Sequence, residues 1–314
     1  MIKKTMLNKK QIEEILDSYA IGKIVDFKFI KNGFMHSHYF LQTDTGFFVL
    51  RIYEARTDDE ALLEAKVLKR LDNTNIPIPN MIPTDTGKYF TEYKQKRVAL
   101  FYFLPGKDIE EKQVTLTHIK NLGCVLGKLH KELTGFKPKE INSKNDYTVV
   151  YIKKILEKIK KEHTDFPVYH EKIILENLKK IDIPTLPKGI NHGDMFGDNV
   201  LFVGSDVTGV LDFDDCYYGN FLGDLSRGLI YWCIGDFIDF QKCKCFVQAY
   251  IEQRSLNEEE IDYLYEQTLL IALVHAVHLL EDEENWTEEL RPIKVINNLN
   301  KITKEEFYSR IFSK

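Results

Sequence analysis

Short apolar runs separated by turn residues fill the first hundred positions, a pattern typical of β-strands. Such runs cover residues 25–30, 39–42 and 47–53, and the last two flank the turn Thr43-Asp44-Thr45-Gly46. A glycine-containing turn between two apolar runs predicts a hairpin. Two further strands are predicted at 88–93 and 97–103, after a proline-containing connector at 73–83 that must be extended.

Apolar positions at helical spacing begin within this part and dominate the rest of the chain. A short helix is predicted at 9–19 and a long one at 58–71, where Leu63, Val67 and Leu71 fall on one stripe. Beyond Leu104-Pro105-Gly106 the pattern is almost entirely helical. Helices are predicted there at 119–133, 147–161, 171–181, 222–234, 237–253 and 258–280, followed by a charged tail that is also helical in pattern.

The change of pattern at Pro105-Gly106 predicts two lobes and an α+β fold class. We expect an N-terminal sheet lobe over residues 1–104 and a larger helical lobe over residues 105–314, in which the helices of 140–183 are candidates for an insertion. A chain of 314 residues is long enough for each lobe to bury a core of its own.

Composition and charge exclude several classes of function. The net charge is −5 and the pI is near 6.0, so the chain lacks the basic surplus of a nucleic-acid-binding protein. The longest apolar run, residues 269–280, is too short to span a bilayer, and the N-terminus lacks the apolar core of a signal peptide. Five scattered cysteines predict free thiols. We therefore expect a cytoplasmic protein without a nucleic-acid or membrane partner.

The candidate chemistry lies within residues 190–215. Apolar runs at 200–203 and 207–211 flank a Gly-Ser-Asp turn and predict a β-hairpin. Because a hairpin returns its exit to its entrance, Asn199 and Asp212 should lie close together. An amide oxygen and a carboxylate suit an Mg²⁺ ion that also binds a substrate's phosphates, and Asp194 could accept a proton beside it. A base and a phosphate-binding metal are the parts that phosphoryl transfer needs.

The same residues resemble the signature of a known family. His192-Gly193-Asp194-x-x-x-x-Asn199, followed by Gly209-Val210-Leu211-Asp212-Phe213, resembles the catalytic motif of aminoglycoside phosphotransferase-like small-molecule kinases. The resemblance runs through nearly the whole chain. It implies a two-lobed, protein-kinase-like fold with ATP between the lobes, Asp194 as catalytic base, and Asn199 and Asp212 as Mg²⁺ ligands.

Further positions match the family outside the catalytic motif. Phe48-Val49-Leu50-Arg51 resembles the strand that carries the cation for the phosphates, and Glu64 resembles the partner of that cation on the first long helix. Asp224 resembles a buried aspartate that supports the catalytic loop. Arginine replaces the protein-kinase-type lysine at position 51. It keeps a permanent charge and can donate hydrogen bonds to a phosphate and to Glu64 at the same time.

Within the superfamily the chain is most similar to the homoserine kinase type. Residues 186–190, which lead into the run from His192 to Phe202, carry this similarity, together with the earlier stretches 39–40, 50–54 and 76–79. After Asp212, however, the sequence continues Phe213-Asp214-Asp215 where the homoserine kinases have aromatic residues. That departure leaves the substrate open and does not affect the expected chemistry.

The remaining candidate residues are assigned by position. Gly33 and Ser37, in an early loop, could contact the ATP phosphates, although a single glycine is equally typical of an ordinary turn. Beside the lobe joint, the backbone groups of Tyr102, Phe103 and Leu104 are expected to recognise the adenine ring by hydrogen bonding. His192 and Asp198 are expected to support the catalytic loop, and Asp198 is equally well read as a simple turn residue.

Four residues are candidates for binding the acceptor. Asp214 and Asp215 would suit a substrate ammonium group, or they hydrogen-bond to backbone at the hairpin exit. Tyr218 and Trp232 either face the substrate or belong to the core.

The sequence thus predicts an ATP- and Mg²⁺-dependent kinase of a small-molecule alcohol such as homoserine or a similar amino alcohol. An aminoglycoside kinase, a choline-like kinase or a kinase of another metabolite of the same superfamily is the alternative enzyme. A catalytically inactive nucleotide-binding protein is the alternative outside enzymes, although the intact set of Asp194, Asn199 and Asp212 argues against it. The oligomeric state is left open.

Overall fold

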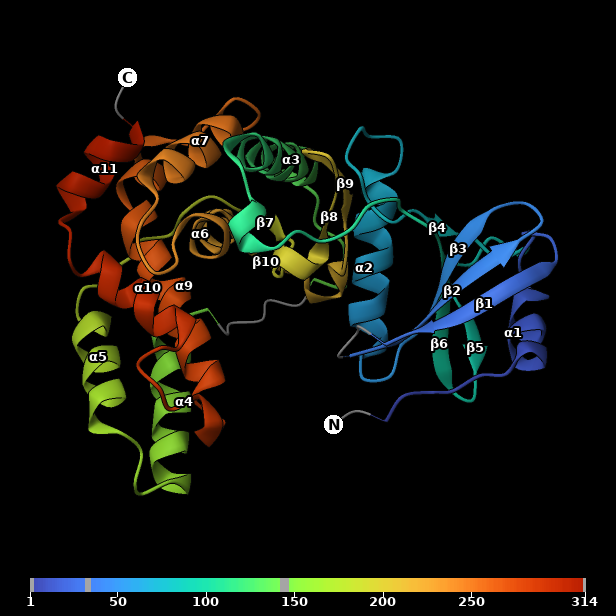
Figure 1. The fold of residues 1–314 in the computed structure, drawn as a ribbon, viewed down its shortest axis with the longest axis horizontal. Coiled ribbons are helices and arrows are strands. Elements are labelled where there is room, and N and C mark those ends of the chain that lie inside the picture. The colour runs from blue at the N-terminus through green and yellow to red at the C-terminus, as the bar shows by residue number, and fades with distance from the viewer. Residues whose placement is uncertain (1–2, 32–34, 142–146, 313–314) are drawn as a thin grey trace.

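The computed structural model describes residues 3–31, 35–141 and 147–312 and shows a sheet lobe joined to a larger helical lobe (Figure 1). The prediction of a two-lobed α+β fold is confirmed. Helix α2 (Asp58–Leu71) lies between the sheet and the helical lobe. Among the described helices, none is both long and apolar enough to cross a membrane.

The N-terminal lobe is one antiparallel sheet with a helix at each side. Its strand order is β1-β2-β3-β6-β4, with β5 paired to β6. Alternate residues of the sheet, such as Leu41, Leu50 and Leu100, are fully buried in a small core with Ile12. The elements are α1 (Lys9–Leu16), β1 (Ile24–Ile30), β2 (Ser37–Thr43), β3 (Phe47–Ile52), α2, β4 (Met81–Ile82), β5 (Thr91–Tyr93) and β6 (Lys96–Tyr102).

Local signals explain why α2 begins and ends as predicted. Thr57 and Glu60 form a reciprocal capping box at its first turn, where Asp58 and Asp59 also complement the helix dipole. The face that carries Ala61, Val67 and Leu71 is buried. The bounds of this helix are those that the periodicity predicts.

The helical lobe surrounds α9 (Leu264–Leu279), which is apolar on nearly every side and buried along most of its length. Helices α4 (Val149–Glu162), α5 (Val168–Leu178), α6 (Leu222–Gly228), α8 (Glu258–Asp262), α10 (Arg291–Leu299) and α11 (Lys304–Phe312) contact it, and α3 (Leu116–Leu133) and α7 (Phe240–Ile251) pack against each other. Two strand pairs complete the lobe: β7 (Lys188–Asn191) with β10 (Tyr217–Asn220), and β8 (Val200–Val203) with β9 (Asp206–Val210).

Several elements differ from the prediction. The helix predicted at 258–280 is broken at Tyr263 into α8 and α9, and the one predicted at 222–234 changes at residue 229 into a π-helix, Leu229–Cys233. Strands β4, β7 and β10 were not predicted, because each is short and pairs with a partner distant in sequence. The strand predicted at 88–93 is only three residues long.

The joint between the lobes is tied to the β8–β9 hairpin. Lys107 exchanges two backbone hydrogen bonds with Phe202 (3.2 and 2.8 Å), and the hydroxyl of Thr208 donates to the carbonyl of Pro105 (2.6 Å). Gly106 has a φ of +120°, and a Cβ there would lie 2.5 Å from Thr208 Oγ1. Glycine is therefore required at 106 for both backbone and space.

Helices α3 and α7 pack closely because two glycines of α3 face the backbone of α7. A Cβ at Gly123 would lie 2.4 Å from the carbonyl oxygen of Phe246, and one at Gly127 would lie 2.6 Å from that of Tyr250. This contact holds α3 directly against α7.

Replacing Gly123 with alanine should force α3 and α7 apart and lower the free energy of unfolding by about 1–3 kcal/mol, the usual cost of overpacking. Chemical denaturation followed by far-UV circular dichroism measures the change. Cys124→Ala, at the next position of the same helix, is the matched control and should cost much less. Equal stabilities of the two variants would contradict the close packing.

Candidate active site

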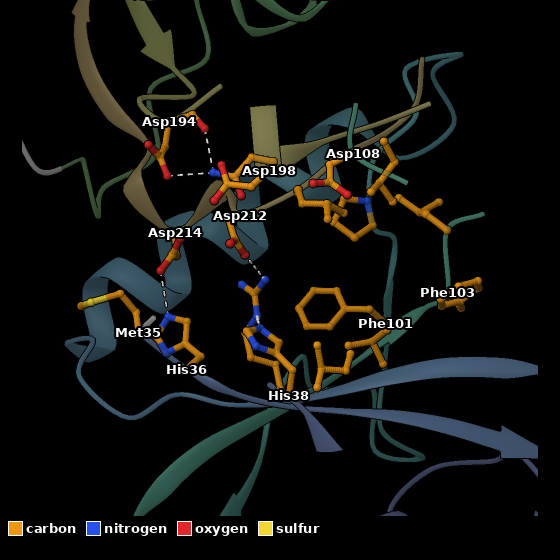
Figure 2. Close-up of a pocket in the computed structure, with 18 of the residues that line it drawn as sticks. Met35, His36, His38, Phe101, Phe103, Asp108, Asp194, Asp198, Asp212 and Asp214 are labelled. Atoms are coloured by element: carbon orange, nitrogen blue, oxygen red, sulfur yellow. Dashed lines mark hydrogen bonds and ion pairs between the residues drawn. The ribbon is translucent and has the colours of Figure 1, made fainter. Parts of the chain in front are cut away.

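A cleft of about 770 Å³ lies between the two lobes and is the place where the predicted site residues meet. Figure 2 shows Asp194, Asp212 and Asp214 gathered on one side of it and Phe101 and Phe103 on the other. Of the predicted site residues, Arg51, Tyr102, Phe103, Leu104, Asp194, Asp198, Asn199, Asp212, Asp214 and Asp215 line the cleft. The volume is that of a pocket for a nucleotide-sized ligand.

Asp194 and Asn199 form the centre of the loop that the sequence predicts to be catalytic, called the catalytic loop below. The loop leaves β7, turns at Gly193 with a φ of +88°, and enters β8 through a short 3-10 turn at Gly197–Asn199. The Asn199 amide nitrogen donates to both the carbonyl and the carboxylate of Asp194, each at 2.8 Å. This pair of bonds fixes the Asp194 carboxylate at the wall of the cleft.

The environment of Asp194 suits proton transfer. Burial and the negative charge of Asp215 raise the pKa of Asp194 to about 7, although the positive charge of Arg227 opposes the rise. A base with a pKa near the working pH accepts a proton well and can give it up again.

The hairpin brings Asp212 to Asn199 as predicted, because the backbone nitrogen of Leu211 donates to the carbonyl of Asn199 at 2.8 Å. Asp212 itself adopts a left-handed backbone conformation with a φ of +57°. Aspartate tolerates this region better than most residues. The turn directs the Asp212 side chain toward β3, where it meets Arg51.

Arg51 binds two carboxylates, one in each lobe. Its Nη1 donates to Glu64 at 2.8 Å and its Nη2 donates to Asp212 at 2.5 Å. Its Nε donates to Nε2 of His38 at 2.9 Å, so His38 is an acceptor there and carries its proton on Nδ1. Burial and the neighbouring Arg51 lower the pKa of His38 well below its usual value, which agrees with a neutral ring.

The oxygen atoms at the hairpin fit a hard divalent cation. The Asn199 amide uses its nitrogen for both hydrogen bonds to Asp194, which leaves Oδ1 as an oxygen donor, and Oδ2 of Asp212 is not the atom that Arg51 binds. Within the described residues, no group of three or more His, Cys, Asp or Glu side chains could hold a metal alone. Two protein oxygens match Mg²⁺, which takes its other ligands from water and phosphates.

Asp224 anchors the catalytic loop through hydrogen bonds to its backbone. Its carboxylate accepts hydrogen bonds from the backbone nitrogens of His192 (2.5 Å) and Gly193 (3.0 Å), and from Nε2 of His130 (3.2 Å). Burial alone would raise the pKa of Asp224, but the hydrogen bond from His130 and the charge of Arg227 outweigh burial and lower the pKa to about 2. Asp224 is therefore ionised at any physiological pH.

His192 supports the loop from within. Its Nε2 donates to the carbonyl of Leu211 at 2.8 Å, and its Nδ1 accepts from the backbone nitrogen of Asp194 at 3.1 Å. Because one nitrogen must carry the proton and the other must lack it, the ring is the neutral Nε2–H tautomer. His192 thus joins the entrance of the loop to the end of the hairpin.

The acid pair Asp214 and Asp215 lines the cleft, but two side chains of the N-terminal lobe bind it. Arg56 donates to Asp214 at 2.9 Å and to Asp215 at 2.8 Å, and His36 lies 2.8 Å from Asp214 (Figure 2). Asp214 is buried. Its carboxylate therefore joins the lobes in this structure, and the contact with a substrate ammonium stays a prediction.

Ser37, Tyr218 and Trp232 are not among the residues that line the cleft, and Trp232 takes the core alternative. Ser37 is fully buried and donates to Glu54 at 2.5 Å, and Trp232 lies behind the catalytic loop with its Nε1 donating to the carbonyl of Met195 at 3.2 Å. Tyr218 packs near Lys137 and is not among the residues that line the cleft. Gly33 lies outside the described residues.

Sequence reasoning missed Arg56 and the role of His36. Both partner Asp214, from which they are separated by more than 150 positions. A single arginine before a helix carries no local signal of such a contact. The only hint was the unexplained acid pair after Asp212, which required a cation from somewhere in the fold.

Comparison with known proteins agrees with this geometry. Residues 26–245 match the phosphotransferase enzyme family. Homoserine kinase of Methylobacillus flagellatus is 27% identical over 261 residues, which cover 82% of this chain and 79% of that protein. Homoserine kinase of Zymomonas mobilis is 29% identical over 264 residues, with coverage of 82% and 81%.

Solved structures share the fold at low identity. An amicoumacin kinase in complex with AMP-PNP and Ca²⁺ superposes with a TM-score of 0.67 at 14% identity, covering 97% of this chain and 94% of that one. A microcompartment-associated aminopropanol kinase gives 0.62 at 15%, with coverage of 97% and 99%. Choline kinase from Cryptosporidium parvum gives 0.65 at 15%, with coverage of 90% and 91%.

Replacing Asp224 with asparagine should remove a pH-dependent part of the stability. Because folding lowers the pKa of Asp224 from about 3.8 to about 2, its contribution is complete above pH 4 and is lost as the pH falls toward 2. The stability difference between the wild type and Asp224→Asn should therefore shrink by up to about 2 kcal/mol over this range. Urea denaturation at pH 6, 4 and 3 measures it. Asp206→Asn, at an exposed turn, is the control; a difference independent of pH would contradict the assignment.

Proposed function

The chain belongs to the phosphotransferase enzyme family, and from this membership we propose that it transfers the γ-phosphate of ATP to a hydroxyl group of a small molecule. The observation that carries the proposal is the bond of Asn199 to Asp194 beside the Arg51–Asp212 pair, all on one wall of the cleft. This arrangement supports the proposal, because phosphoryl transfer needs a base, metal-binding oxygens and a phosphate-binding cation within one site.

In the proposed reaction, Asp194 orients the acceptor hydroxyl and takes its proton as the oxygen attacks the γ-phosphate. Asn199 and Asp212 would hold Mg²⁺, which neutralises the phosphate charge when bound. Arg51 supplies a permanent positive charge for the phosphates, and its bonds to Glu64 and to Oδ1 of Asp212 would keep its guanidinium in place while Oδ2 of Asp212 faces the metal site. Asp224 and His192 keep the loop rigid, and precise positioning is the main source of rate in phosphoryl transfer.

We assign the nucleotide to the cleft between the lobes. The backbone of residues 102–104 borders it beside the joint and would read the adenine ring. The boundary between an ATP-binding lobe at 1–104 and a catalytic lobe at 105–314 is part of this proposal, as is an insertion within 140–183.

Homoserine or a similar amino alcohol is the proposed acceptor. The homoserine kinases that match most of this chain support it, and the similarity of the fold to an aminopropanol kinase fits an acceptor of that size. Aminoglycosides and choline-like alcohols are the competing acceptors within the same superfamily.

Asp194→Asn should lower phosphate transfer by about 10²–10⁴-fold, because the amide cannot accept the hydroxyl proton. ATP binding should persist, since Asp194 is not assigned to the nucleotide. Coupled ADP release measures transfer, and calorimetric titration with ATP and Mg²⁺ measures binding. Asp206→Asn serves as the control with unchanged turnover. Full activity of Asp194→Asn would remove Asp194 as the base.

A panel of acceptors should identify the substrate class. With ATP and Mg²⁺, we expect L-homoserine or a close amino alcohol to stimulate ADP release more than choline or an aminoglycoside does, and EDTA to abolish the stimulation. Preference for choline or an aminoglycoside would replace the proposed acceptor. If ATP binds and no alcohol stimulates ADP release, the chain is a nucleotide-binding protein without kinase activity.

A further inference from the structure

Arg227 is a buried cation that the proposed reaction does not use. It stands on α6, has no solvent exposure, and its Nη1 donates to the hydroxyl of Tyr217 at 3.0 Å. Its Nε and Nη2 have no hydrogen-bond partner among the described residues. A buried guanidinium with two unsatisfied donors is costly, and such a group usually marks a missing partner.

Aromatic rings explain how Arg227 is held but do not satisfy its donors. The guanidinium carbon lies 4.2 Å from the ring centre of Tyr147 and 5.4 Å from that of Tyr217. A guanidinium donates within its own plane, so a ring stacked on its face leaves the N–H groups at its edge unpaired.

Asp224 does not satisfy the unpaired donors of Arg227 either. Its nearer oxygen is 3.5 Å from Nη1 of Arg227, which is an ion pair but not a close hydrogen bond. Both oxygens of Asp224 already accept from the backbone of the catalytic loop. The charge of Arg227 is thus partly balanced by Asp224, while Nε and Nη2 remain available.

A second unsatisfied group lies on the facing helix. Nδ1 of His275, on α9, is buried without a partner among the described residues. Its ring contacts Phe196 of the catalytic loop and Tyr231, with ring centres 5.7 and 5.5 Å away. Burial and the charge of Arg227 lower the pKa of His275 well below its usual value, which places a neutral imidazole beside this cation.

Ring contacts connect these groups to the loop of the proposed base. Tyr231 stacks on Phe196 with ring centres 3.8 Å apart, His275 contacts both of these rings, and the positive charge of Arg227 lowers the pKa of Asp194. Phe196 follows Asp194 by only two positions. An acceptor whose hydroxyl meets Asp194 would therefore extend its other end toward α6 and α9.

We propose that Arg227, with His275 beside it, forms a subsite for the carboxylate of an acceptor that carries both a hydroxyl and an anionic group. A carboxylate accepts two N–H groups from one edge of a guanidinium, which is the number left unsatisfied on Arg227. The inference rests on the proposed kinase function and narrows it, because choline and aminoglycosides lack a carboxylate. It assigns the chain to hydroxy amino acids rather than to purely cationic alcohols.

Two acceptors that differ only in the carboxylate test the subsite. L-homoserine and 3-aminopropan-1-ol are titrated calorimetrically into the full-length protein saturated with a non-hydrolysable ATP analogue and Mg²⁺. Homoserine should bind at least about 30-fold more tightly, the smallest effect expected when a buried charge loses its partner. Equal affinities, or no binding of either compound, would overturn the subsite, and this comparison needs no variant.

Arg227→Lys adds the residue-level test, because lysine keeps the charge but cannot present two parallel donors. The variant should bind homoserine more weakly and 3-aminopropan-1-ol with unchanged affinity. The ratio of the two affinities should therefore approach one. Arg254→Lys is the matched control. Arg254 also stacks on a ring (Phe221, 4.1 Å), but it donates to Tyr250 and Glu260 in this structure. Loss of the preference in both variants would overturn a specific role of Arg227.

Transfer assays separate the subsite from the reaction. If both alcohols are phosphorylated with equal KM values, the result supports the kinase function and contradicts the carboxylate subsite. Preferential binding of homoserine without any ADP release from ATP would keep the subsite and remove the kinase function.

Discussion

The burial of Arg51 is the constraint on which the site depends. A guanidinium does not lose its proton in a protein, so a buried one must be surrounded by acceptors. Arg51 finds Glu64 on α2, Asp212 at the end of the hairpin and His38 on the neighbouring strand. One side chain therefore links the sheet, the helix between the lobes and the loop that carries a proposed metal ligand. Removing any one of these acceptors would leave a buried N–H group of Arg51 without its partner.

The aspartates of the site show how environment separates residues of the same type. Asp224 accepts two backbone N–H groups and stays ionised, with a pKa of about 2, whereas the pKa of Asp194 rises to about 7 in a buried place beside other acids. Asp214 is shared by Arg56 and His36 and belongs to the contact between the lobes. Different neighbours thus make one aspartate a structural anchor, another a proposed proton acceptor and a third a contact between the lobes.

Features encoded by neighbouring residues could be predicted from the sequence. The capping box and stripe of α2, the hairpin at 200–210 and the cluster of Asp194, Asn199 and Asp212 all depend on spacings within one segment. The pairing of Arg51 with Glu64 came from family resemblance, and the structure confirms the contact. In contrast, β7 pairs with β10 and Arg56 pairs with Asp214 because the whole fold brings distant segments together. For Trp232 the sequence left the cleft and the core open, and the structure places it in the core with its Nε1 donating to the carbonyl of Met195.

The bonds that tie the lobe joint to the hairpin restrict how the two lobes can rotate. Pro105 and Lys107 are hydrogen-bonded to Thr208 and Phe202, so the joint is attached to the hairpin of the helical lobe. The same hairpin also binds the connector of the N-terminal lobe, because the backbone nitrogen of Val210 donates to the carbonyl of Pro77 (2.7 Å). Asn199 and Asp212 lie at the other end of this hairpin. Moving the sheet away from the helical lobe would therefore separate Arg56 from Asp214 and Asp215, whereas the proposed metal ligands Asn199 and Asp212 would stay with the hairpin.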